Sequence, residues 1–107
     1  MESHRLPVQT VNRVEIVDLT PAIQALVGQS GVEEGIAHVF VQHTSAAIAI
    51  QENEPNLLED FQEFLRRFAN DDPENPTWKH NQLWRRPDVA SDETLNADAH
   101  LKAMFLG

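Results

Sequence analysis

The sequence predicts an α+β fold, in which two to three helices pack on a mostly antiparallel β-sheet or sandwich. Apolar residues alternate with polar ones along residues 6–18, 36–42 and 46–51, as they do in strands with one buried face. Residues 54–69 instead carry apolar side chains at helical spacing. A chain of 107 residues with 41% hydrophobic residues should form a single domain, residues 1–107, around one modest core.

The first expected strand, residues 6–18, leads into a short helix. Its length suits a strand that lies at an edge of the sheet or bends. Thr20 and Pro21 then indicate a helix start, because threonine is a good N-cap and proline is tolerated at the first helical position. Gly28 is the residue at which we expect this helix to end.

The second and third expected strands, residues 36–42 and 46–51, should form either a hairpin or one bent strand. His43, Thr44 and Ser45 interrupt the apolar pattern between them. Buried polar groups that lack a partner cost about 1–3 kcal/mol each. We therefore interpret this polar stretch as a turn that belongs to a functional site.

Two further helices are expected, at residues 54–69 and 96–106. Asn53 can cap the first of them, whose apolar stripe covers a broad face. Either Asn96 or Asp98 can cap the second, although Asp98 could equally bond to a neighbouring histidine.

Charge and cysteine content exclude several classes of function. The chain has 8 basic against 17 acidic residues and a formal net charge of −9, so nucleic acid and an anionic membrane surface are unsuitable partners. No apolar run approaches the roughly 18 residues that a membrane helix needs. The chain has no cysteine, which excludes disulfides and thiolate ligands and fits a cytoplasmic location.

Three motifs make the chain similar to the YjbQ-like family. They are HTSAAIAIQEN at residues 43–53, WKH at 78–80 and NADAHLKAMFLG at 96–107. Members are often labelled secondary thiamine-phosphate synthases, and the resemblance implies a homotrimer with pockets near the subunit interfaces. Family members usually continue with strands that complete the sheet, so we expect a C-terminally shortened member or a fragment.

Three histidines of these motifs are candidate metal ligands. Neutral imidazoles that converge in a fold make a good site for a transition metal. Spacing alone leaves open that His43, His80 and His100 only brace loops through hydrogen bonds. The resemblance matches them to histidines that gather in the family pocket, where some members carry a metal. It therefore implies a divalent ion, and zinc is the ion that three imidazoles suit best.

Glu52, Ser45 and Lys102 are the candidate catalytic residues. The resemblance assigns Glu52 as a general base or as a carboxylate that orients a histidine, whereas the residues alone suggest a carboxylate beside a helix end. Ser45 shares strand parity with His43 but has no glycine elbow around it, so its hydroxyl is expected to bond the backbone or a ligand phosphate. Lys102 and the pair Arg85–Arg86 are the positive charges near the motifs, and a phosphorylated substrate would need them or a metal.

The function implied by the resemblance is low-level thiamine-phosphate synthesis, which joins a pyrimidine diphosphate and a thiazole phosphate. Lys102 and the metal would neutralise the departing pyrophosphate. Two alternatives remain open from the sequence. One is a metal-dependent hydrolase of a small molecule, and the other is a non-catalytic binding or structural oligomer.

Overall fold

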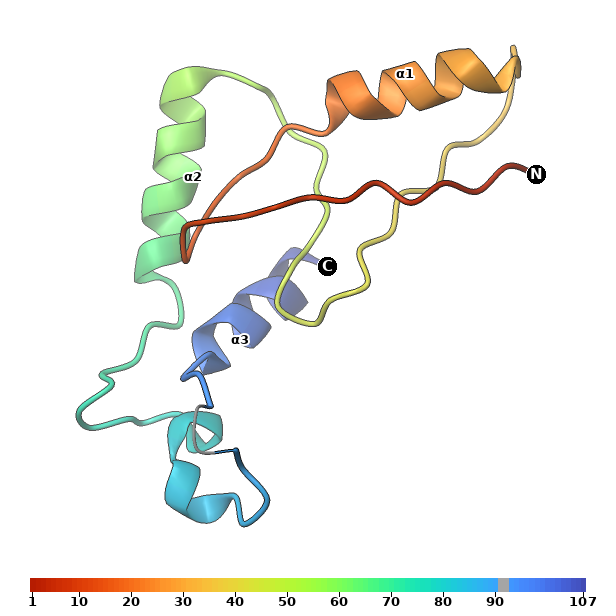
Figure 1. Ribbon diagram of the computed structural model, residues 1–107. Coiled ribbons are helices and arrows are strands. Elements are labelled where there is room, and N and C mark those ends of the chain that lie inside the picture. The colour runs from red at the N-terminus through yellow and green to blue at the C-terminus, as the bar shows by residue number, and fades with distance from the viewer. Residues whose placement is uncertain (91–92) are drawn as a thin grey trace.

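The computed structural model describes residues 1–90 and 93–107, and within them the regular structure is entirely helical. The elements are α1 (Thr20–Ser30), α2 (Pro55–Arg67), the 3₁₀ turns η1 (Lys79–Asn81) and η2 (Leu83–Arg85), and α3 (Ala97–Leu106). Long irregular segments join the helices (Figure 1). Within these described ranges, no helix is both long and apolar enough to cross a membrane.

The prediction of an α+β fold with a mostly antiparallel sheet or sandwich is wrong. Residues 6–18, 36–42 and 46–51 contain no strand in the part of the chain that is described, and no backbone hydrogen bond joins these segments to one another. Alternation shows which side chains could share a buried face, but a strand forms only where a second strand pairs with its N–H and C=O groups. In place of the hairpin there is one turn, in which Ala46 N donates to His43 O at 3.4 Å.

Helix α1 follows the expected signals with shifted ends. The helix begins at Thr20 with Leu19 in the N-cap position, so the prediction of Thr20 as the N-cap is wrong. Asp18 Oδ1 accepts a hydrogen bond from the Thr20 amide at 2.9 Å. The helix runs through Gly28 and stops at Gly31, whose φ of 71° lies in the left-handed region that favours glycine.

Helix α2 is capped by Glu54 rather than by Asn53. The Glu54 carboxylate accepts from Asn56 N at 3.1 Å and from Leu57 N at 2.7 Å, which satisfies two amides that the helix leaves unpaired at its start. The Asn53 side chain instead donates to Asp18 at 3.2 Å. Asn53 therefore ties the segment before α2 to the segment before α1.

Aromatic rings connect α2 to α3. Phe64 and Phe68 stack with their centroids 5.8 Å apart, and Phe68 meets Phe105 of α3 at 4.9 Å. The apolar core is nevertheless very small, because Ala97 is the one hydrophobic residue of the described ranges that is buried. The radius of gyration is 17.3 Å, compared with roughly 13 Å for a compact domain of this length.

The loop between α2 and η1 is organised by Asp71. Its carboxylate accepts from the amide and hydroxyl of Thr77, both at 2.7 Å, from Trp78 N at 3.2 Å and from Asn81 Nδ2 at 2.9 Å. Burial by itself would raise the pKa of Asp71, but these donors hold the pKa well below its usual range. Asn81 in turn accepts from Ala97 N at 3.0 Å, so the loop fixes η1 against the start of α3.

Candidate functional site

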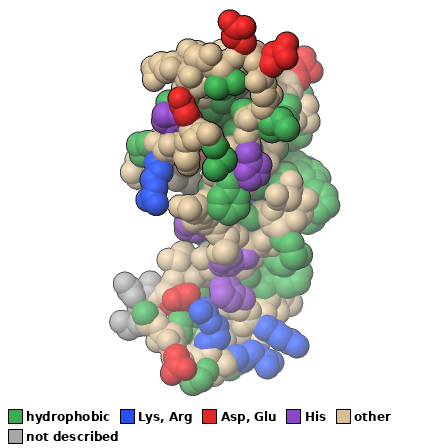
Figure 2. Space-filling model, turned by 90° about the vertical axis from the view of Figure 1, so that its right-hand side faces the viewer, with side chains coloured by type: hydrophobic (Ala, Val, Ile, Leu, Met, Phe, Trp, Pro, Cys, Tyr) green, Lys and Arg blue, Asp and Glu red, His purple; other side chains and the backbone are tan. Residues whose placement is uncertain are grey.

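His80 of η1 and His100 of α3 lie side by side. Their ring centroids are 5.1 Å apart and the rings meet nearly at right angles. Both rings line a shallow groove of about 320 Å³, together with Trp78, Lys79, Ala97 and Leu101. Figure 2 shows histidine side chains accessible on one face of the molecule, close to lysine and arginine side chains. The structure therefore brings together the histidines of the WKH and NADAH motifs.

Hydrogen bonds fix which nitrogen carries the proton in each neutral ring. His80 Nε2 lies 3.2 Å from Asn96 Oδ1, and His100 Nδ1 lies 3.3 Å from the carbonyl oxygen of Thr44. Oxygen atoms of amides and carbonyls can only accept, so both of these ring nitrogens donate. The lone pairs are left on His80 Nδ1 and His100 Nε2, where each can bind a cation or accept a proton.

The contact between His100 and Thr44 brings the HTSA turn to α3 across 56 positions of sequence. The ring of His43 is engaged differently. Its Nδ1 lies 3.1 Å from Ser45 N and 2.7 Å from Ser45 Oγ. A backbone amide can only donate, so Nδ1 is the accepting nitrogen of a neutral His43 and its proton is on Nε2.

The three histidines do not form a metal cluster in this conformation. No group of three or more histidine, aspartate or glutamate side chains is placed to hold an ion in residues 1–90 and 93–107. His80 and His100 supply two neighbouring nitrogen ligands. The place of His43 beside them stays a prediction.

Ser45 and Glu52 stay predictions as catalytic residues. The Ser45 hydroxyl bonds the His43 ring rather than the backbone, within the turn that replaces the expected hairpin. Glu52 is exposed, and its amide donates to Gln51 Oε1 at 3.0 Å. The cap of α2 is Glu54, so the carboxylate at the helix end is the one two positions after Glu52.

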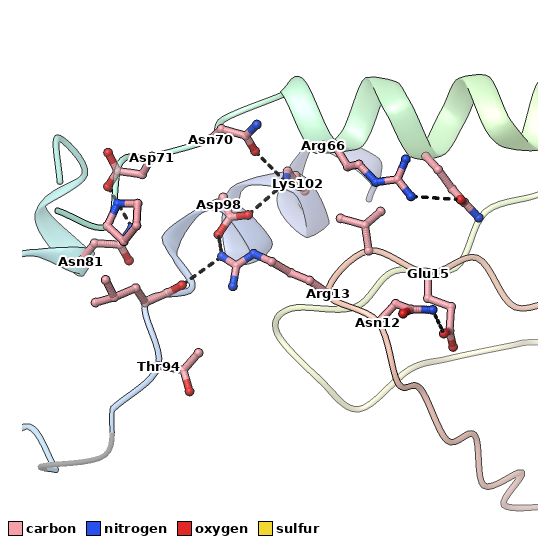
Figure 3. Close-up of a pocket in the computed structure, with 14 residues that line it drawn as sticks. Asn12, Arg13, Glu15, Arg66, Asn70, Asp71, Asn81, Thr94, Asp98 and Lys102 are labelled. Atoms are coloured by element: carbon pink, nitrogen blue, oxygen red, sulfur yellow. Dashed lines mark hydrogen bonds and ion pairs between the residues drawn. The ribbon is translucent and has the colours of Figure 1, made fainter. Parts of the chain in front are cut away.

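Lys102 lies in a second, larger cleft (Figure 3). This cleft has a volume of about 880 Å³. The Lys102 side chain is only 9% exposed and donates to Asp98 Oδ2 at 3.0 Å and to Asn70 Oδ1 at 3.3 Å. Lys102 does not line the histidine groove, so the structure separates it from the two histidines with which the sequence grouped it.

Asp98 joins two cations across the fold. Its other oxygen, Oδ1, accepts from Arg13 Nη2 at 2.6 Å. Burial would raise the pKa of Asp98, but the hydrogen bond from Lys102 and the positive charges of Lys102 and Arg13 hold it below its usual range. The two roles expected for Asp98, a helix cap and a partner of His100, are both wrong, because its two oxygens bond Lys102 and Arg13.

Arg85 and Arg86, which were expected beside the motifs, bond mainly to residues of the loop that carries them. Arg85 donates to Gln82. Arg86 pairs with Glu93 at 3.2 Å and donates to the carbonyl oxygen of His80 at 3.3 Å. Arg86 therefore helps to fix the backbone that carries His80.

Sequence reasoning missed Arg13 as a site residue. The residue lies 85 positions from its partner Asp98, and nothing local to it signals the contact. The spacing of Asp98 and Lys102 was a usable signal, because residues four apart face each other on a helix.

Comparisons with known proteins agree on one family. Residues 4–107 match the family model described as UPF0047 protein YjbQ-like. The chain is 36% identical over 105 residues to a UPF0047 protein of Methanothermobacter thermautotrophicus, covering 98% of this chain and 64% of that protein. It is 36% identical over 102 residues to a UPF0047 protein of Archaeoglobus fulgidus, covering 95% and 68% of the two chains.

A bacterial relative gives a similar result. The UPF0047 protein YugU of Bacillus subtilis is 32% identical over 103 residues, covering 95% of this chain and 67% of that protein. The chain thus spans slightly less than two thirds of the Methanothermobacter protein. No solved structure shows a significant match to the chain.

Proposed function

Because the chain belongs to the UPF0047 protein YjbQ-like family, we propose that it is a cytoplasmic small-molecule enzyme of the thiamine-phosphate synthase type. The histidine groove would be its active site. The observation that carries this proposal is the edge-to-face pair of His80 and His100. The pair lies where the WKH and NADAH motifs meet, and the HTSA turn reaches it through Thr44. Two separate segments of the chain thus line the groove, and the HTSA turn holds one of its rings in place.

The proposed reaction joins a pyrimidine diphosphate and a thiazole phosphate. A bond forms between the thiazole nitrogen and the methylene carbon of the pyrimidine, while the bond from that carbon to the diphosphate oxygen breaks and pyrophosphate leaves. Negative charge develops on the departing pyrophosphate, so a cation or a proton donor beside it would lower the barrier. Without a metal, a second proton on His80 or His100 would serve as that donor.

A divalent ion, with zinc as the best candidate, is proposed for the same groove. His80 Nδ1 and His100 Nε2 fit this purpose, because hydrogen bonds to Asn96 and Thr44 hold both rings in the tautomer that leaves these atoms free. His43 would become the third ligand only if its ring turned away from Ser45. When bound, the ion would supply the positive charge that the leaving pyrophosphate needs.

The remaining catalytic assignments are proposals of the same kind. Glu52 would act as a general base or orient an imidazole, and its exposed carboxylate leaves it able to do so. Ser45 would hold His43 in one tautomer through the 2.7 Å contact. Lys102 would contribute charge from the neighbouring cleft rather than contact the groove.

We also propose a homotrimer. Large apolar side chains lie exposed on the helices, including Phe64 at 51%, Met104 at 76% and Phe105 at 63% exposure. Exposed apolar patches of this kind favour association, because burying them removes apolar surface from water. Sedimentation at a series of protein concentrations tests this, and a monomer at every concentration would contradict it.

Two measurements test the function. Metal analysis after gentle purification should find a divalent ion that the double variant His80→Ala, His100→Ala no longer retains. Incubation with the pyrimidine diphosphate and the thiazole phosphate should then release pyrophosphate from the chain but not from that variant. Release of phosphate from other small esters would favour the hydrolase instead, and a chain that holds no metal and releases nothing would favour a binding or structural oligomer.

A further inference from the structure

We propose that Arg13 and Lys102 form an anion subsite, which binds a phosphate or diphosphate group in the cleft of about 880 Å³. This subsite is separate from the histidine groove, because the residues that line the two do not overlap. The inference goes beyond the proposed function and rests on it only for the identity of the substrate. Phosphate binding itself can be measured without turnover.

Arg13 is held in place but still has donors to offer. One of its nitrogens, Nη2, donates to Asp98 at 2.6 Å and to the carbonyl oxygen of Leu95 at 3.0 Å. Nε and Nη1 have no partner in the described ranges, and the side chain is 60% exposed. A guanidinium that is anchored through one nitrogen can present the others to an incoming oxyanion at little entropic cost.

Lys102 supplies the second positive charge of the same site. Its ammonium group can donate three hydrogen bonds and gives two of them, to Asp98 and Asn70. Figure 3 shows Asp98 between the guanidinium of Arg13 and the end of Lys102. Two cations share this one carboxylate, so the cluster keeps an excess positive charge beside the cleft.

The other carboxylates that line the cleft are already occupied. Asp71 accepts from four donors of its own loop. Glu15 accepts from Asn12 Nδ2 at 3.0 Å and from Val11 N at 3.4 Å. Acidic and basic residues of the lining are equal in number, so unsatisfied donors, rather than net charge, make the cleft suitable for an oxyanion.

The size of the cleft fits a small phosphorylated molecule rather than a bare ion. Pockets for small molecules usually enclose about 300–1,000 Å³, and the volume here lies inside that range. Asn12, Asn70 and Thr94 add neutral hydrogen-bonding groups to the lining. We therefore assign phosphate monoesters and diphosphates as the ligand class.

The test is a calorimetric titration of the full chain with inorganic phosphate and, separately, with pyrophosphate. A chelator is present in both titrations. The variant Arg13→Gln should bind both anions at least about tenfold more weakly, as expected for the loss of a charge-assisted hydrogen bond. Arg67→Gln is the matched control. Arg67 is an exposed arginine that pairs with Glu63 at 2.8 Å and does not line the cleft, so binding should be unchanged.

Two results would overturn the subsite. One is equal weakening by Arg13→Gln and Arg67→Gln, and the other is no binding by the unaltered chain at about 10 mM anion. If Arg13→Gln loses its helical circular dichroism, Arg13→Lys decides, because lysine keeps the charge and loses the fork. If the subsite is present, Arg13→Lys should bind phosphate and pyrophosphate several-fold more weakly than the unaltered chain. Unchanged binding by Arg13→Lys overturns the subsite. Failure of the synthase assay with intact phosphate binding would count against the proposed function alone.

Discussion

Asp98 Oδ1 and Arg13 Nη2 lie 2.6 Å apart, although 85 positions of sequence separate the two residues. This contact ties the N-terminal segment to α3 in a molecule with very few buried apolar residues. The same carboxylate holds Lys102, whose side chain is 9% exposed. Much of the tertiary order around the large cleft therefore depends on one polar side chain.

Asp98→Asn should destabilise the fold by about 2–3 kcal/mol. The change removes the counter-charge of a buried ammonium, which costs about 3–5 kcal/mol where both partners are fully buried, and Arg13 is exposed enough to reduce that cost. Urea unfolding measures the difference. Asp60→Asn, at an exposed position of α2, is the control and should change the free energy of unfolding by less than about 0.5 kcal/mol.

Acid should destabilise the fold through Asp71 and Asp98. Both pKa values are lower in the folded chain than in the unfolded chain, so the unfolded state binds more protons in mildly acidic solution and stability rises with pH. The contribution of these carboxylates is complete above their unfolded pKa of about 4 and is lost as pH falls through the folded values. Unfolding measured from neutral pH downward should show this decline.

The variant Asp71→Asn separates the two carboxylates. Its unfolding free energy should be lower at neutral pH and should fall less steeply in acid, because one of the two titrating groups is gone. A pH dependence identical to that of the unaltered chain would contradict the role of Asp71.

Glu54→Ala should destabilise α2 by about 1 kcal/mol, the usual cost of removing an N-cap. The carboxylate accepts from two amides, Asn56 N and Leu57 N, and alanine leaves both without that partner. Circular dichroism during urea unfolding reports the loss. Glu59→Ala, an exposed position inside the same helix, should cost little, and an equal loss in the two variants would exclude a capping role.

Asn96→Ala should weaken the zinc binding that we propose for the histidine groove by about ten- to a hundredfold, the usual effect of removing a group that orients a metal-bound histidine. Asn96 accepts from His80 Nε2 at 3.2 Å and so keeps Nδ1 free. Competition with a chromogenic chelator measures the affinity. Asn75→Ala, at an exposed loop position, should leave it unchanged.

Local signals in the sequence predicted the helices well. The apolar stripe and Pro55 are read within one segment, and α2 forms where they lie. The observed N-cap, Glu54, lies one residue after the predicted one, Asn53. Both side chains carry suitable oxygens, and the backbone conformation before the helix decides which of them caps it. The ion pair of Asp98 and Lys102 could also have been predicted, because residues four apart face each other on a helix.

Contacts between distant segments could not be predicted in the same way. Alternation along residues 6–18 predicted a strand that does not form, because pairing depends on a second segment that the pattern does not specify. The sequence could not assign Arg13 to Asp98 for the same reason. The family motifs name His80 and His100 together, and the two ring centroids are 5.1 Å apart, but their role as metal ligands stays a prediction. The hydrogen bond between the His43 ring and Ser45 depends on the backbone conformation of the turn.

The scarcity of buried apolar surface affects how the chain responds to heat and denaturant. Exposure of apolar surface on unfolding sets the heat-capacity increment, which is about 1.3–1.6 kcal/mol/K for a typical domain of this length. Ala97 is the one buried hydrophobic residue of the described ranges, so unfolding the isolated chain exposes less additional apolar surface than unfolding a compact domain of this length. The heat-capacity increment of unfolding should be correspondingly small and the urea transition broad. When the chains associate, the increment should rise and the transition should become steeper.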